Sequence, residues 1–231
     1  MREIVLDTET TGLDPNSGDR IVEIGCVELI NHIPSGRTYH QYINPERDMP
    51  VEAYNVHGLS MDFLMGYPIF SAIADKFLEF IDDGLLIIHN ADFDMGFINA
   101  ELVKLNLKKL NMDRSLDTVR LARQKFPGAP ANLDALCRRF NIDNSNRQMH
   151  GALLDARLLA DVYLELNGGR QTDLVLTGTL APNDTASGHQ KSIIRPPRHH
   201  SVNPEDEARH KAFIETLNDP LWLKNSLLTL K

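Results

Sequence analysis

Apolar runs separated by turn residues dominate the first part of the chain. The segments 4–10, 20–30 and 37–44 are rich in β-branched and other apolar residues and are bounded by clusters of Gly, Pro, Asn and Asp, a pattern typical of strands. We expect a turn over residues 31–36, because this segment contains a proline and a glycine. The three segments together predict an antiparallel meander.

Helical periodicity begins near residue 69. Apolar residues recur with the spacing of a helix in the segments 69–81, 93–105, 118–126, 133–140 and 151–166. Residues 51–70 lack this spacing and are expected to be irregular. The wholly apolar run 85–88 is typical of a strand buried on both faces, and a short strand is expected to end near 116–118. This alternation predicts an α/β fold in which helices flank a mixed central sheet.

The composition changes after residue 168. Residues 169–203 are rich in Gly, Ser, Thr, Asn, Pro and His, which is typical of a flexible linker. Residues 204–231 begin with acidic residues suited to the first turn of a helix and continue with a short amphipathic segment. Such a tail has too little core to fold alone, so we expect it to dock onto a partner protein. Residues 1–168 are expected to form the catalytic domain.

The length and net charge of the chain exclude several classes of protein. A chain of 231 residues with 42% hydrophobic residues can form one well-cored domain and an appendage. Residues 1–168 carry a net charge of −9, against −8 for the whole chain, so the domain lacks the basic surface of an autonomous DNA-binding protein. No apolar run is long enough to span a membrane, and we expect a cytoplasmic protein. Cys26 and Cys137 are expected to be core residues rather than a disulfide or a zinc site.

Two acidic residues lie at the end of the first predicted strand, at a spacing of two. Asp7 and Glu9 would point to the same face of that strand, where they repel each other. A shared cation would relieve this repulsion, and the alternative is a pair of solvated acids at a strand end. Asp92 and Asp94 follow the buried run 85–88, and the ends of such strands commonly converge on a ligand.

His150 and Asp155 lie at the start of the last predicted helix of the domain. Five residues apart, they would lie about 140° apart on one helix. They can share a site only if His150 lies in the preceding loop and Asp155 on the first turn. Alone, His150 would more often be a capping or surface histidine.

Three motifs built on these residues resemble those of the DEDDh 3′→5′ exonucleases. They are Asp7-x-Glu9 with Thr8, Thr10 and Gly12, then His89-Asn90-Ala91-x-Phe93-Asp94, then His150-x4-Asp155. The resemblance covers about residues 2–167. Within the family, the motifs are most similar to those of the epsilon-type proofreading exonucleases of bacterial DNA polymerase III.

The resemblance implies a ribonuclease-H-like fold and a two-metal site. Its metal ligands would be Asp7, Glu9, Asp94 and Asp155, which would hold two divalent ions, Mg²⁺ or Mn²⁺. Carboxylate oxygens are the ligands that such hard cations prefer. His150 would be the general base that activates water. Asp92 occupies the variable position of its motif and is interpreted as a solvated acid at the start of a helix.

The resemblance also implies contacts to the terminal nucleotide. The expected substrate-binding residues are Thr8, Glu9, Thr10, Leu13, Glu52, His57, Asn90 and Asp155. Glu52 would lie near the 3′ hydroxyl and His57 near phosphate or sugar, while Asn90 could instead cap the helix that follows it. Phe93 and Phe97 are interpreted as core residues. The other histidines are interpreted as solvated or structural: His32, His40, His89, His189, His199, His200 and His210.

The hexapeptide 171–176 resembles motifs that bind a sliding clamp. Gln171 is followed by apolar Leu174 and Leu176, and the alternative is an ordinary linker or strand. By the same resemblance, the tail 204–231 would dock onto the catalytic (alpha) subunit of polymerase III. The sequence leaves open whether a small stabilising subunit also binds.

These features predict a metal-dependent 3′→5′ exonuclease that removes mismatched nucleotides from frayed, single-stranded 3′ ends of DNA. One alternative is an exonuclease of the same family that acts on RNA ends or oligoribonucleotides. A second alternative is a non-catalytic adaptor between clamp and polymerase, although the intact set of four acids and His150 argues against it.

Overall fold

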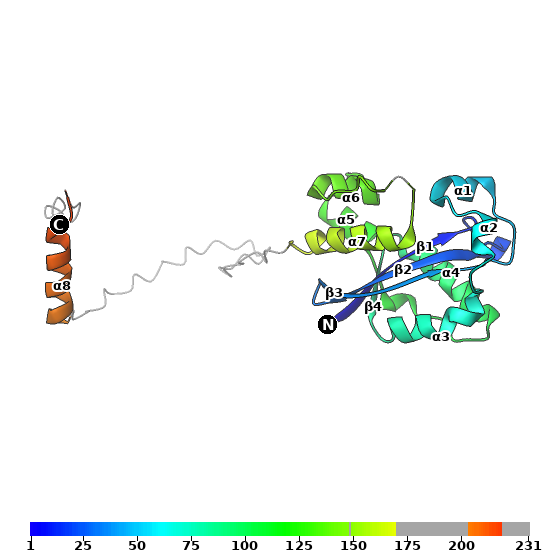
Figure 1. Ribbon diagram of the computed structural model, residues 1–231, viewed down its shortest axis with the longest axis horizontal. Coiled ribbons are helices and arrows are strands. Elements are labelled where there is room, and N and C mark those ends of the chain that lie inside the picture. Colours follow the sequence, from blue (N-terminus) through cyan, green and yellow to red (C-terminus); the bar gives the residue numbers. More distant parts are fainter. Residues whose placement is uncertain (148, 170–202, 219–231) are drawn as a thin grey trace, which may run out of the picture. The chain divides into compact units, whose positions relative to one another are not determined.

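The computed structural model describes residues 1–147, 149–169 and 203–218 (Figure 1). The chain divides into a unit of residues 1–176 and a second unit of residues 177–231. Within the described residues of the second unit, one helix, α8 (Pro204–Glu215), begins at the acidic segment identified in the sequence. No helix in the described ranges is both long and apolar enough to cross a membrane.

A five-stranded mixed sheet forms the centre of the first unit. Its strands are β1 (Arg2–Thr10), β2 (Ile21–Ile30), β3 (Ile33–Tyr42), β4 (Leu85–Ile88) and β5 (Ser115–Asp117). Their order is β3-β2-β1-β4-β5. The first three strands form the predicted antiparallel meander, and β4 and β5 run parallel to β1. The prediction of an α/β fold with a mixed sheet is confirmed.

The predicted turn at residues 31–36 is too long. Strand β3 begins at Ile33, and the turn is confined to Asn31 and His32, which have φ angles of 52° and 67°. Pro34 pairs with Leu29 of β2. The edge position of β3 tolerates this proline, because an edge strand has hydrogen-bonding partners on one side only.

Two hydrophobic cores cover the two faces of the sheet. On one face, α3 (Phe70–Ile81) and α4 (Ala91–Lys104) pack against Ile4, Leu6 and Ile88. On the other, α5 (Thr118–Lys125), α6 (Leu133–Phe140) and α7 (Ala152–Leu166) pack against Val5 and Ile87 (Figure 1). Alternate residues of β1 and β4 thus enter different cores, which confirms that the run 85–88 is buried on both faces.

The segment 51–70 contains two short helices and is not irregular as predicted. They are α1 (Val51–His57) and α2 (Met61–Leu64). In each of them only one residue is buried, His57 and Leu64 respectively. A helix that buries a single side chain leaves no apolar stripe in the sequence, so periodicity could not reveal it.

The two cysteines are buried and free, which confirms their interpretation as core residues. Phe97 is also buried in the core, as predicted. Two short 3₁₀ helices, Pro15–Ser17 and Met112–Arg114, complete the described elements of the first unit.

Candidate active site

The face of β1 that carries Asp7 and Glu9 is the face covered by α7. Val5, Asp7 and Glu9 alternate with residues that enter the other core. Helix α7 begins at Ala152, so His150 lies in the preceding loop and Asp155 in the first turn. With a spacing of five residues, the two side chains can share a site only in this arrangement. Asp155 is therefore brought to the end of β1.

Gly25 of β2 allows α7 to come this close. It is the register partner of Asp7. A Cβ atom at this position would lie 2.2 Å from the backbone nitrogen of Leu153 and 2.3 Å from the carbonyl carbon of Ala152. No side chain larger than hydrogen fits between the strand and the backbone of the helix. Sequence reasoning did not identify this requirement.

Asp94 reaches the cluster from the first turn of α4. It is buried, and the Thr8 hydroxyl donates a hydrogen bond of 2.7 Å to its Oδ1 atom. Burial raises the pKa of Asp94 to about 7, although the hydrogen bond from Thr8 opposes this shift. Thr8 thus fixes the orientation of a carboxylate as well as lining the site.

Burial and, after it, mutual repulsion raise the pKa values of the two carboxylates of β1. Burial and the charges of Asp94, Glu9 and Asp155 raise the pKa of Asp7 well above its usual range. Burial and the charges of Asp155 and Glu23 raise the pKa of Glu9 to about 8. Asp7, Glu9 and Asp94 therefore bind protons more tightly than isolated acids do, and together with Asp155 they form one cluster of interacting acids.

Arg147 is the main positive group beside this cluster, and the sequence analysis missed it. Its Nε and Nη2 atoms each lie 2.6 Å from an oxygen of Asp155, and its Nη1 atom lies 2.8 Å from Asp134. Burial alone would raise the pKa of Asp155, but hydrogen bonds from Arg147 and His150 outweigh it and hold this pKa below its usual range. Asp155 is thus the one acid of the cluster with a protein counter-charge at hydrogen-bonding distance among the described residues.

His150 lies at the exposed rim of the cluster. Its side chain is 46% exposed, and its Nδ1 atom lies 3.4 Å from Asp155 and 3.0 Å from Arg147 Nη2. Its backbone N–H donates to the carbonyl of Val56, which ties this loop to α1. An exposed imidazole beside buried carboxylates can exchange protons with solvent and with a bound water.

The donor set fits a divalent cation. Ligand atoms of Glu9, His150 and Asp155 all lie within 4.8 Å of one another. The cluster supplies carboxylate oxygens in a site where negative charges repel one another, and hard divalent cations prefer such ligands. The charges of Asp94, Glu9 and Asp155 act on the carboxylate of Asp7, so Asp7 and Asp94 lie near these ligand atoms.

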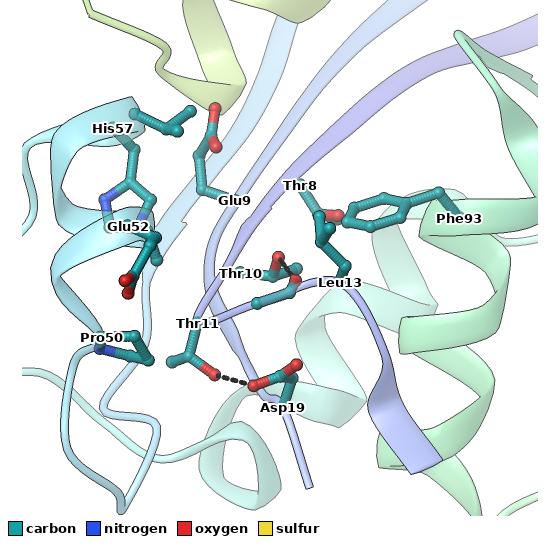
Figure 2. A pocket seen from close by; sticks show the side chains of 13 residues that line it. Thr8, Glu9, Thr10, Thr11, Leu13, Asp19, Pro50, Glu52, His57 and Phe93 are labelled. Carbon is teal, nitrogen blue, oxygen red and sulfur yellow. Dashed lines mark hydrogen bonds between the residues drawn. The ribbon is translucent and has the colours of Figure 1, made fainter. Parts of the chain in front are cut away.

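A cavity of about 480 Å³ opens beside the cluster. It is lined by Thr8, Glu9, Thr10, Thr11, Gly12, Leu13, Asp19, Pro50, Glu52, Ala53, Val56, His57 and Phe93. Figure 2 shows Glu52 and His57 on one side and Leu13 and Phe93 on the other. The structure thus brings together six of the residues predicted to bind the nucleotide: Thr8, Glu9, Thr10, Leu13, Glu52 and His57.

The rings of Phe93 and His57 line this cavity. Phe93 was interpreted as a core residue, but it both packs against the core and lines the cavity. His57 is buried, and burial lowers its pKa, so the ring is neutral at neutral pH. Its Nδ1 atom accepts a hydrogen bond from the N–H of Leu59, and its Nε2 atom has no hydrogen-bond partner among the described residues.

Asn90 does not lie in this cavity. It lines a second one, beside Asp92. Asn90 occupies the N-cap position of α4, as the alternative predicted, but its side chain forms no hydrogen bond to the helix. Asp92 is exposed on the first turn of α4, as predicted.

The remaining histidines of the first unit make structural contacts, as predicted. His32 pairs with Glu3, His40 with Glu23, and His89 lies 2.9 Å from the Thr118 hydroxyl. His210 is exposed on α8. The predictions for Gln171, Leu174, Leu176, His189, His199 and His200 lie outside the described residues.

The exonuclease family profile RNase_T matches residues 4–163. The chain therefore belongs to the exonuclease family. It is 50% identical over 228 residues to DNA polymerase III subunit epsilon of Rickettsia felis, an alignment that covers 94% of this chain and 97% of the relative. It is 46% identical over 176 residues to DNA polymerase III subunit epsilon of Escherichia coli K12, covering 73% and 72% of the two chains.

Solved structures share the fold. The nuclease domain of 3'hExo, a DEDDh family member bound to rAMP, superposes with a TM-score of 0.62 at 18% identity and covers 72% of this chain and 92% of that one. Exonuclease X in complex with 5′ overhanging duplex DNA gives a TM-score of 0.56 at 21% identity, covering 71% and 90%. The ribonuclease-H-like exonuclease fold is confirmed. Exonucleases of the DEDDh type generally use two divalent metal ions, which the donor set described above fits.

Proposed function

We propose that this protein removes mismatched nucleotides from the 3′ end of DNA as the proofreading exonuclease of DNA polymerase III. The observation that carries the proposal is a cluster of four acids beside a cavity large enough for one nucleotide. Within this cluster, burial and mutual repulsion raise the pKa values of Asp7 and Glu9. Relatives named as the epsilon subunit, at about half identity over nearly the whole chain, support the same function. In this account the protein acts in the cytoplasm.

Asp7, Glu9, Asp94 and Asp155 are proposed to hold two Mg²⁺ or Mn²⁺ ions. When bound, such ions polarise the scissile phosphate, lower the pKa of water and stabilise the leaving 3′ oxygen. The chain's own contribution is to keep four carboxylates in place before the substrate arrives. Thr8 contributes by orienting Asp94, and Gly25 contributes by letting α7 deliver Asp155.

His150 is proposed as the general base. It lies at the solvent-facing edge of the cluster, where it can take a proton from the attacking water and release it to solvent. The ring is oriented by contacts to Asp155 and Arg147 at its Nδ1 atom. In the tautomer in which the Nδ1–H donates to Asp155, the Nε2 atom carries the lone pair that receives the proton.

The terminal nucleotide is proposed to occupy the cavity lined by Leu13, Glu52, His57 and Phe93. Leu13 is 85% exposed and Phe93 is half-buried on the opposite side from Glu52, so both apolar side chains can contact a base. Glu52 can accept a hydrogen bond from the 3′ hydroxyl. His57, which lines the same cavity, can bond to sugar or phosphate. None of these contacts reads a particular base.

Selectivity for mismatches then arises from fraying. A mispaired end separates at lower cost than a paired end, and only a separated strand can enter the site. The acidic domain binds DNA weakly by charge alone. We propose that the hexapeptide 171–176 binds the clamp and the tail 204–231 binds the alpha subunit, which together raise the local concentration of DNA ends.

A primer assay tests this function. Duplexes with a paired or a mispaired 3′ nucleotide are digested in Mg²⁺ or Mn²⁺, alongside single strands of DNA and RNA of the same sequence. We expect stepwise 3′ loss that is faster on the mispaired primer and faster on DNA than on RNA. Equal rates on paired and mispaired primers would contradict proofreading, and a preference for RNA would favour the oligoribonuclease alternative.

A truncation tests the partner assignments. Deletion of 204–231 should leave hydrolysis of short single strands unchanged and abolish co-elution with the polymerase alpha subunit. A double substitution of Leu174 and Leu176 to Ala should weaken clamp binding without affecting co-elution with alpha. Co-elution of the truncated chain with alpha would refute the docking role of the tail.

A further inference from the structure

A second cavity, of about 650 Å³, adjoins the candidate active site. It is lined by His89, Asn90, Asp92, Asp117, Val119, Arg120, Arg123, Ala131 and Asn132. These residues come from the β4–α4 junction, the start of α5 and the loop before α6. Most of them are polar, in contrast to the largely apolar wall of the first cavity.

The first turn of α4 connects the two cavities. Asp92 lines the second cavity, Phe93 lines the first, and Asp94 belongs to the carboxylate cluster. The two cavities therefore lie on either side of a single helical turn, at the ends of neighbouring parallel strands.

Arg120 and Arg123 are the basic residues of the second cavity, which also contains the acids Asp92 and Asp117. Both are exposed, and neither side chain forms a hydrogen bond or an ion pair with any described residue. Asp117, the nearest acid in sequence, is engaged by the backbone N–H groups of Val119 and Asn90. Two uncommitted guanidinium groups in an acidic domain form a site suited to phosphate oxygens.

We propose that this cavity binds the sugar-phosphate backbone of the strand on the 5′ side of the scissile phosphate, with Arg120 and Arg123 contacting one phosphate each. The proposal rests on the proposed function, in which the terminal nucleotide fills the first cavity. The scissile phosphate then lies at the carboxylates, and the strand continues past α4. The amides of Asn90 and Asn132 can bond to sugar or phosphate, which gives Asn90 a substrate contact outside the nucleotide cavity.

The test compares substrates with and without an upstream strand. The p-nitrophenyl ester of thymidine 5′-monophosphate carries one nucleotide, with the nitrophenyl group in place of that strand, whereas a ten-nucleotide DNA extends into the second cavity. For the double variant Arg120→Gln/Arg123→Gln, we expect unchanged hydrolysis of the ester. For the ten-nucleotide strand, we expect KM to rise about tenfold with little change in kcat, because each of the two solvent-exposed charge pairs contributes only modestly to binding.

Salt dependence gives a second readout. Each phosphate contact to a single strand contributes a slope of about 0.7 in log affinity against log salt. The double variant should therefore lose about 1.4 from the slope measured by fluorescence anisotropy with a labelled strand. The control is Lys108→Gln/Lys109→Gln, which removes the same charge from the loop that precedes β5, at the opposite ends of the strands.

The outcomes separate this proposal from its alternatives. An equal rise in KM for both double variants would mean a general effect of net charge and would overturn the proposal, as would no change in either. Loss of ester hydrolysis in the arginine variant would place these residues at the catalytic centre instead. If the wild type hydrolyses neither substrate, the proposed function fails, and the anisotropy slopes then decide alone whether the cavity binds a strand.

Discussion

Replacing Gly25 with Ala should impair catalysis by this domain much more than its folding. The new Cβ atom would lie 2.2 Å from the backbone nitrogen of Leu153, whereas ordinary van der Waals contact begins at 3.4 Å. The obstacle is backbone, so no side chain can rotate away. Helix α7 must retreat by about 1 Å, and Asp155 retreats with it.

The size of the effect follows from this displacement. Overpacking of this kind costs about 1–3 kcal/mol in the free energy of unfolding, which a domain with two complete cores tolerates. A displacement of about 1 Å in a catalytic group costs about a hundredfold in rate. We therefore expect Gly25→Ala to remain folded, with a lowered Tm, and to lose about a hundredfold in kcat on single-stranded DNA.

The assay measures kcat on a single-stranded DNA and thermal unfolding by circular dichroism on the same preparation. Gly96→Ala is the matched control. It adds a methyl group to α4 two residues after Asp94, where no atom lies within 4 Å, and it should stabilise the helix by up to about 1 kcal/mol. Gly25→Ala with wild-type kcat and Tm would refute the close packing of α7 as the device that places Asp155.

Other predictions concern the charge of the same site. Without metal, the free energy of unfolding should fall as the pH rises from about 4 to about 8, because the folded protein retains protons on Asp94 (pKa about 7) and Glu9 (pKa about 8) that the unfolded chain has released; urea titrations in EDTA measure this slope, and a flat profile contradicts it. For the same reason, Mg²⁺ should raise Tm more at pH 8 than at pH 6, which thermal scans at both pH values test. Asp94→Asn should lower kcat by at least about a thousandfold yet raise Tm in EDTA, because one repelling charge is removed; a variant with lower Tm would show that the carboxylate is needed for folding. Arg147→Gln should lower the free energy of unfolding in EDTA by about 3 kcal/mol, as expected when one partner of a buried ion pair is removed. Mn²⁺ should then stabilise this variant more than it stabilises the wild type. Equal stabilisation of both would mean that Arg147 and the cation do not share Asp155.

Features that depend only on residues close in the sequence could be predicted from the sequence pattern. The period of a strand placed Asp7 and Glu9 on one face, and the five-residue spacing placed His150 in the loop and Asp155 on the first turn, as the structure has them. The alternation of apolar and turn residues also predicted the order of the strands and of the longer helices, although it missed α1 and α2. In each case the information lies within a few residues of the feature.

Features that depend on distant partners were not predictable in this way. Arg147 is a long side chain in a loop, and nothing in its neighbours indicates that it ends on Asp155. Pro34 and its neighbours form a strand because β2 offers a partner, although a proline locally favours a turn. Gly25 looks like an unremarkable strand residue until α7 is placed against it.

The central claim is that the carboxylate cluster hydrolyses DNA from the 3′ end with the aid of divalent metal ions. Its most direct test is a digest of 5′-labelled and 3′-labelled single-stranded DNA in Mg²⁺, Mn²⁺ or EDTA, by the wild type and by Asp7→Asn. We predict a descending ladder from the 5′-labelled strand, immediate release of the 3′ label as a mononucleotide, and no cleavage in EDTA or by the folded variant. Cleavage by Asp7→Asn at the wild-type rate, or no cleavage by folded wild type with either metal, would contradict the account.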